Sequence, residues 1–208
     1  MGNRGRFGKY GEIKRLDRLK RARKGPPFSR EADFKSPGRA SHHRKSVGES
    51  TPVRIRPAKP SDSRFILLLS ENVFRIYGPY EKIIGGWLES GMTVTLIALM
   101  NRKPAGFAMI SHFPQEANLQ QISEILAIAV TPEKQRTGSG EMLLKALERK
   151  AAGINIRELF LHTAEENLAA QNLFIKNKYV SRGIIESFYP AGQNALVMSK
   201  KIGKIPSP

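Results

Sequence analysis

The segment from Glu124 to Gly140 constrains the fold of this chain more than any other part of its sequence. An apolar stretch of strand length, Ile125–Val130, runs through Thr131-Pro132 into the polar loop Gln135-Arg136-Thr137-Gly138-Ser139-Gly140. Leucines at helical spacing follow directly. The segment therefore predicts a strand, a glycine-containing loop and a helix in immediate succession.

This loop has the features of a phosphate site. Glycines let the backbone approach a ligand closely, and loop amides together with a helix N-terminus bind anions. Lys134 and Arg136 add positive charge. Two well-known phosphate motifs do not fit, because a P-loop needs lysine where Glu141 stands and the dinucleotide fingerprint needs glycine at Leu143. The alternative is an ordinary strand-to-helix turn that uses glycine only for its geometry.

The remaining periodicities predict an α/β fold with a mixed, mostly antiparallel sheet flanked by helices. The hairpin of Met92–Met100 with Gly106–Phe113 provides antiparallel pairing. The other predicted strands are Val53–Pro57, Ser123–Val130, Leu159–Thr163, Tyr179–Tyr189 and Ala195–Lys200, and the helices are Phe65–Phe74, Glu81–Leu88, Gly140–Ala152 and Ala169–Asn177.

The positive charge is concentrated before this domain. The net charge is +17, and residues 1–50 carry 15 Lys/Arg against 5 Asp/Glu, while the rest carries 20 against 13. Few large apolar residues accompany the charge, so we expect a disordered basic tail over residues 1–51, a domain over 52–202 and a short tail over 203–208. Such a tail favours weak contact with RNA, ribosomes or another polyanion; a role in solubility alone is the alternative.

Composition excludes several classes of function. There is no cysteine, which rules out disulfides, thiolate metal sites and a cysteine nucleophile, and which favours a reducing, cytoplasmic compartment. The chain has four histidines, two of them adjacent in the tail, and this number argues against a metal site built from histidines. No apolar stretch approaches the ~20 residues that a membrane-spanning helix needs, and no secretory signal is evident.

The motifs together resemble the GNAT superfamily of N-acetyltransferases over roughly residues 53–202. Gln135-x-x-Gly138-x-Gly140 after the apolar strand is similar to the family's acetyl-CoA signature. Asn167-x-x-Ala170-x-x-Leu173-Phe174, ending at Tyr179, resembles its second motif. Phe188-Tyr189-Pro190 with Ala195-Leu196-Val197-Met198 resembles the C-terminal strands of the branch that acetylates protein α-amino groups, including ribosomal-protein alanine.

The resemblance implies acetyl-CoA as co-substrate and assigns residues to it. Backbone groups of Ile128 and Val130 would pair with the pantetheine arm, and Asn167 would approach that arm from the second motif. The pyrophosphate would lie on the amides of the signature loop. The cofactor residues implied are therefore Ile128, Val130, Gln135, Arg136, Thr137, Gly138, Ser139, Gly140, Asn167 and Phe174.

The catalytic assignment starts from the need for a neutral amine, which requires a proton acceptor. Glu124 is the preferred base, because it lies 14 residues before Gly138, where many GNAT enzymes place a carboxylate. His162 is the alternative base, since neutral imidazole accepts a proton near pH 7. A strand glutamate in solvent and a packed strand histidine are the structural alternatives. Tyr189 could donate a proton or be a packed tyrosine.

Two positions depart from the family pattern. Phe174 stands where the family's usual tyrosine protonates the leaving thiolate, and His162 stands where the ribosomal branch has a glutamate base. Tyr77, Tyr80 and Trp87 fall where the first helices would line an acceptor groove or pack in the core. The sequence thus favours transfer of an acetyl group to a primary amine, possible acceptors being a protein N-terminus, a lysine or a small amine. The alternative is a catalytically weak acetyl-CoA-binding module tethered to RNA or ribosomes.

Overall fold

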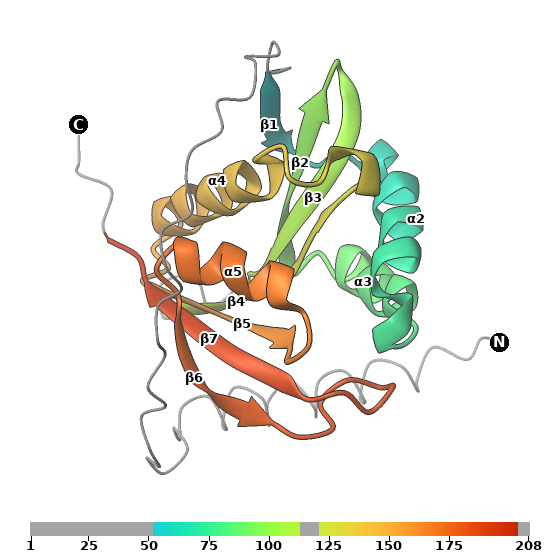
Figure 1. The fold of residues 1–208 in the computed structure, drawn as a ribbon. Coiled ribbons are helices and arrows are strands. Elements are labelled where there is room, and N and C mark those ends of the chain that lie inside the picture. Colours follow the sequence, from blue (N-terminus) through green and yellow to red (C-terminus); the bar gives the residue numbers. More distant parts are fainter. Residues whose placement is uncertain (1–51, 113–120, 204–208) are drawn as a thin grey trace, which may run out of the picture. The chain divides into compact units, whose positions relative to one another are not determined.

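The computed structural model describes residues 52–112 and 121–203, which form a seven-stranded sheet with helices on both faces (Figure 1). The predicted basic tail over 1–51 and residues 204–208 lie outside the described residues. The strands are β1 (Val53–Pro57), β2 (Thr93–Met100), β3 (Lys103–Ser111), β4 (Ile122–Val130), β5 (Glu158–Ala164), β6 (Val180–Ile185) and β7 (Ala195–Lys201). The helices are α2 (Ser63–Phe74), α3 (Tyr80–Glu89), α4 (Ser139–Gly153) and α5 (Leu168–Lys176), with short 3-10 turns η1 (Pro60–Asp62), η2 (Arg75–Tyr77) and η4 (Pro132–Lys134).

The sheet order is β1-β2-β3-β4-β5-β7-β6. Every neighbouring pair is antiparallel except β4 and β5, which run parallel. The connection between these two strands is α4, as parallel neighbours require a crossover. The predicted mixed, mostly antiparallel α/β sheet is confirmed.

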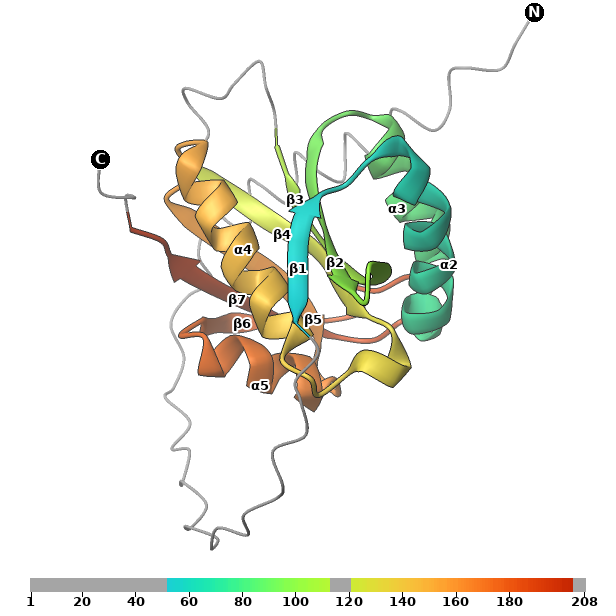
Figure 2. The same cartoon turned by 90° about the horizontal axis from the view of Figure 1, so that it is seen from above.

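The helices divide between the two faces of the sheet, and each face has its own core (Figure 2). Leu143, Leu144 and Leu147 of α4 are fully buried against Leu159 and Leu161 of β5, and α5 packs into this same core. The other face buries Ile66, Leu69 and Ile84 of α2 and α3 against β2 and β3. Apolar side chains three or four residues apart, as in α4 and α2, form one buried stripe, which explains why these segments fold as helices.

One predicted strand ends early. The expected strand over Tyr179–Tyr189 stops at Ile185, and Tyr189 lies in the β6–β7 loop. Ser187 adopts a positive φ of 47°, a left-handed conformation that breaks an extended strand. Its amide donates to Asn194 Oδ1 at 3.1 Å, and the amide of Tyr189 donates to the carbonyl of Gln193. Hydrogen bonds within the loop thus replace strand pairing there.

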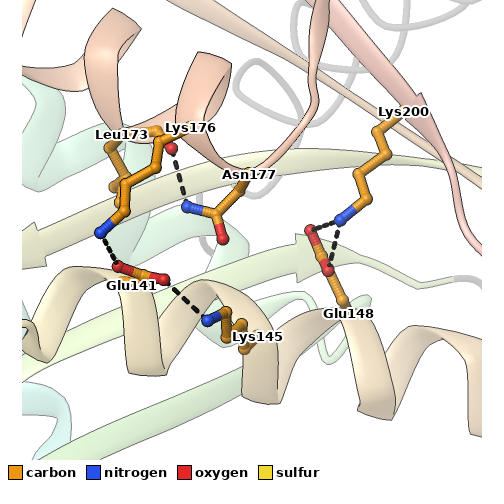
Figure 3. Close-up of polar contacts among 7 residues, drawn as sticks. All are labelled: Glu141, Lys145, Glu148, Leu173, Lys176, Asn177 and Lys200. Carbon is orange, nitrogen blue, oxygen red and sulfur yellow. Dashed lines mark hydrogen bonds and ion pairs between the residues drawn. The ribbon is translucent and has the colours of Figure 1, made fainter.

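Polar contacts hold α4 against α5 and β7 (Figure 3). Glu141, one residue beyond the glycine-containing loop, accepts hydrogen bonds from Lys145 and from Lys176 of α5, both at 2.7 Å. Farther along α4, both carboxylate oxygens of Glu148 lie 2.8 Å from Nζ of Lys200 in β7. The two lysines lower the pKa of Glu141 to about 2. The start of α4 is therefore tied to α5 by a carboxylate that remains ionised in acid.

This ion network predicts a pH-dependent contribution to stability. A folded-state pKa below the ordinary glutamate value of about 4.3 means that Glu141 stabilises the fold above that pH. Its contribution is lost as the pH falls from there toward 2. We expect Glu141→Gln to lower the urea midpoint near neutrality, and the difference from wild type to disappear toward pH 2. Glu133→Gln, in η4 outside this network, serves as the control. A difference that stays constant across this range would contradict the assignment.

Candidate active site

The sheet opens where β4 and β5 part. Their parallel pairing covers only Ile122–Ile125 opposite Glu158–Leu161. Beyond it, β4 continues to Val130 paired with β3, and β5 continues paired with β7. A bulge marks this point, because Met109 pairs with Ala127 and Ile110 with Ile125, so that Leu126 has no direct partner on β3. The result is a strand edge on β4, over residues 126–130, that faces an opening instead of β5.

Side chains of this β4 segment point to both cores. Ile128 and Val130 pack against the core beneath α4, whereas Ala127 and Ala129 belong to the core beneath α2 and α3. Gly106 of β3 makes the approach of β3 to β4 unusually close, since a Cβ there would lie 2.6 Å from the carbonyl oxygen of Ala129. Because the pairing with β5 ends at Ile125, the backbone of Ile128 and Val130 borders the opening. The predicted pantetheine contact requires this position.

The glycine-containing loop is shaped by its own side chains. Thr137 Oγ1 donates to the carbonyl of Lys134 and lies 2.7 Å from Ser139 Oγ, while Gln135 Nε2 donates to the carbonyl of Val130. Ser139 is fully buried. These three predicted cofactor residues thus fix the loop. The first amides of α4 have no partner within the helix, and a helix N-terminus of this kind is a general site for anions.

The two glycines differ in what they permit. Gly138 has a positive φ of 84°, and a Cβ built on it would meet nothing within 4 Å, so its surroundings are open for a ligand. Gly140 is helical, and a Cβ there would lie 3.6 Å from Leu173 Cδ2, an ordinary packing distance. Arg136 also has a positive φ, 59°, and is exposed beside Gly138. The loop therefore offers backbone amides and a guanidinium at one open place.

Asn167 and Phe174, the two predicted cofactor residues of the second motif, have clear structural roles. Asn167 caps α5, its Oδ1 accepting from the amide of Ala170 at 3.1 Å. Phe174 is 6% exposed in the core beneath α4, with its ring edge against Tyr179. The position that holds a tyrosine in the related enzymes is thus a buried hydrocarbon here, with no proton to give.

Glu124 and His162 meet across the start of the opening. His162 Nδ1 lies 2.8 Å from Glu124 Oε1, and their side chains are 8% and 16% exposed. Both side chains project from the face opposite α4, because the neighbouring residues Ile125 and Leu161 lie in the core beneath α4 and side chains alternate along a strand. The His162 ring stacks on Phe188 at 4.3 Å and meets the edge of Phe160.

The sequence presents these two residues as alternative bases, 38 positions apart, and the structure joins them in one hydrogen bond. It also adds Phe188, which the sequence places in the C-terminal motif without a role at the site. Only its place beside Tyr189 in the C-terminal motif could have drawn attention to it. The side chain of His162 points away from α4 and packs against Phe188 of the β6–β7 loop.

Tyr189 lies in an aromatic group beside this pair. Its ring centroid is 4.9 Å from that of Tyr77, 6.0 Å from that of Tyr80 and 5.1 Å from that of Phe188. Burial, reinforced by the neighbouring tyrosines and by Glu124 and Glu166, raises the pKa of the Tyr189 hydroxyl far above its ordinary value. Burial likewise raises the pKa of Tyr77. Tyr189 therefore holds its proton tightly.

The β6–β7 loop is attached to η2 and to the turn that precedes α3. Gln193 Nε2 donates to the carbonyl of Ile76, and the amide of Ala191 donates to the carbonyl of Tyr77. Gly78 has a φ of 125° and touches Pro190, where a Cβ would approach to 2.7 Å. These contacts place the aromatic group beside the opening. Trp87, in contrast, packs in the core beneath α2 and α3.

Two further observations concern the described residues only. None of the helices in the described part of the chain is long and apolar enough to cross a membrane. Between residues 52 and 112 and between 121 and 203, no three histidine, aspartate or glutamate side chains gather in a way that could hold a metal ion.

Comparison with known proteins agrees with this geometry. The model of the acetyltransferase (GNAT) family matches residues 66–178, more than half of the chain. An amino-acid acetyltransferase of Ralstonia nicotianae is 25% identical over 122 residues, which cover 50% of this chain and 25% of the relative. The match thus spans about a quarter of the length of that curated protein.

Solved structures share the fold. The ribosomal-protein-S18-alanine N-acetyltransferase of Escherichia coli superposes with a TM-score of 0.63 at 21% identity, over 75% of this chain and 97% of that one. The yncA protein of Salmonella typhimurium, solved with its cofactor acetyl-CoA, gives 0.62 at 16% identity, over 75% and 97%. With the glycine loop, the parted strands and the family match in agreement, the chain belongs to the GNAT family of acetyltransferases, for which acetyl-CoA is the co-substrate.

Proposed function

We propose that this acetyltransferase transfers the acetyl group of acetyl-CoA to a primary amine, and that the amine is the α-amino group of a protein N-terminus. The observation that carries the proposal is the opening between β4 and β5. The glycine loop and α4 lie on one side of the sheet, and the Glu124–His162 pair lies on the other. A donor bound at the loop and an acceptor beside the pair could therefore meet at the opening.

The ionisation of amines supports an α-amino acceptor. An α-amino group has a pKa of about 7.7–8.0, so roughly a third of it is neutral near pH 7.5, against about 0.1% for a lysine with a pKa of about 10.4. The names of the Ralstonia relative and the E. coli structure also give an amino acid and a protein alanine as acceptors. The aromatic side chains beside the opening suit an uncharged first residue.

A panel of acceptors tests this proposal. We expect a peptide with a free N-terminus and no lysine to be acetylated, and its N-blocked counterpart carrying one lysine to react at least about tenfold more slowly, because so little of the lysine amine is neutral. Mass spectrometry locates the added acetyl group. Free amino acids in the same assay separate a protein acceptor from an amino-acid acceptor. Comparing the proteomes of cells with and without this chain identifies the natural acceptor.

Acetyl-CoA binding without transfer to any amine of the panel would contradict the proposal. That outcome would favour the alternative of a catalytically weak acetyl-CoA-binding module. Faster reaction of the lysine peptide would overturn the assignment to an N-terminus while leaving amine acetylation intact.

If the glycine-containing loop binds the pyrophosphate, a negative charge at Gly138 should weaken acetyl-CoA binding. We expect Gly138→Asp to weaken acetyl-CoA binding by about 10- to 100-fold, equivalent to about 1.4–2.8 kcal/mol, because a carboxylate would face the pyrophosphate. Gly138→Asn is the matched control, since asparagine has the same shape and also tolerates a left-handed φ. Calorimetric titration measures both affinities. Equal affinities for the two variants would show that no phosphate lies at this loop.

We also propose that the basic residues 1–51 attract a polyanion such as ribosomal RNA. Their charge excess supports this, because phosphate contacts release counterions and give a log–log salt slope of about −0.7 per phosphate on single strands. Deleting residues 1–51 should reduce co-sedimentation with ribosomes at low salt and leave turnover of a short peptide unchanged. If the full-length and shortened proteins sediment alike across a salt series, the segment has no such role.

A further inference from the structure

Glu124 and His162 form a hydrogen-bonded pair beside the opening between β4 and β5. We propose that His162 both accepts the proton of the attacking amine and returns it to the leaving sulfur, and that Glu124 is a positioning residue that fixes the imidazole for these two steps. This inference rests on the proposed amine acetylation and adds the roles of its two central side chains.

The hydrogen bond between the two side chains determines where the imidazole carries its proton. A carboxylate, when ionised, can only accept, and His162 Nδ1, 2.8 Å from Glu124 Oε1, is then the donor. In neutral imidazole the proton on Nδ1 leaves the basic lone pair on Nε2. Glu124 therefore cannot easily serve as the base while it holds this hydrogen bond, whereas His162 Nε2 can.

The ring is also held in place by its neighbours. Phe188 stacks on it with the ring planes 15° apart, and Phe160 meets it edge-on at 86°. The amide of Glu124 donates to Ser111 Oγ at 3.1 Å, which anchors the β4 backbone at the same level. A base that is oriented by a third group and fixed by packing loses little entropy when it takes a proton.

Phe174 and Tyr189 are poor proton donors. Phe174 has no acidic proton and lies in the opposite core. Tyr189, whose pKa is raised by burial, gives up its proton less readily than an ordinary tyrosine. His162 is hydrogen-bonded to Glu124, and the titratable groups that act on the nearby Tyr189 are Tyr80, Tyr77, Glu124 and Glu166. Among glutamate, tyrosine and histidine side chains, histidine is the type that ordinarily changes charge between pH 5 and 8.

One imidazole can serve both steps because both reacting atoms are bonded to the same carbon. The amine nitrogen forms a bond to the thioester carbonyl carbon, and His162 Nε2 takes the proton that this nitrogen must lose. The carbon–sulfur bond then breaks, its electron pair stays on sulfur, and the proton on Nε2 passes to that sulfur. The products are the amide and the free thiol, and His162 is neutral again.

Kinetics as a function of pH test the two roles. We expect His162→Ala to change the pH profile of the rate and to lose about 10²–10⁴-fold in kcat, with the affinity for acetyl-CoA unchanged. Added imidazole should restore part of the rate. If the alanine variant fails to bind acetyl-CoA, His162→Asn replaces it. Retention of the wild-type rate and pH profile by a variant that binds acetyl-CoA would overturn the proposal.

Two substitutions of Glu124 separate positioning from proton transfer. Glutamine can donate to Nδ1 and so place the imidazole proton on Nε2, the wrong nitrogen. We therefore expect Glu124→Gln to lose more of kcat than Glu124→Ala. The matched control is Glu148→Gln, because Glu148 also hydrogen-bonds a basic side chain and is 14% exposed against 16% for Glu124. Equal losses in both Glu124 variants, with His162→Ala near wild type, would make Glu124 the base.

A measurement without turnover distinguishes failure of this inference from failure of the proposed function. Nitrogen NMR of the full-length protein, with the His162 signal assigned by its loss in His162→Ala, reports the tautomer directly. We expect the Nδ1-protonated form in the wild type and its loss in Glu124→Ala. The opposite tautomer in the wild type overturns the inference whatever the acceptor is. Absence of transfer to any amine, with the expected tautomer present, contradicts the proposed function instead.

Discussion

The early end of the pairing between β4 and β5 is the constraint on which the site depends. Only four residues of each strand are paired, and the bulge at Leu126 bends β4 away from β5. If the ladder continued, the β4 edge at Ile128 and Val130 would be occupied by β5. Because the ladder stops at Ile125 and Leu161, β4 and β5 are unpaired beyond this point, and the residues of the proposed site lie on both faces of the sheet beside it.

The two faces contribute different chemistry to this gap. On one side, the first turn of α4 presents backbone amides, and its place is secured by Glu141 bridging to α5 and by Glu148 bridging to β7. On the other side, the β6–β7 loop stacks Phe188 on His162, and Gln193 attaches this loop to η2. Helix amides suit a phosphate, whereas a packed imidazole paired with a carboxylate suits proton transfer.

Local sequence signals predicted most of the fold, including the glycine-containing loop between β4 and α4. The leucines of α4 and the glycines at 138 and 140 act through their own backbone and immediate neighbours, so their meaning can be read from a short window. The contact of Glu124 with His162 could not be read in this way. It depends on the register that sets Glu124 beside Phe160, which in turn depends on where the parallel pairing starts. Tyr189 was placed in a strand because nothing in its pattern reveals the left-handed turn at Ser187.

A crystal structure of the protein with acetyl-CoA tests the central claim most directly. The account predicts the pyrophosphate on the amides of residues 136–140, the pantetheine arm along the β4 edge at Ile128 and Val130, and the acetyl carbonyl carbon within about 4 Å of His162 Nε2, a distance that allows reaction without rearrangement. An acetyl group directed away from His162, with neither the imidazole nor a single bridging water in reach, would contradict it.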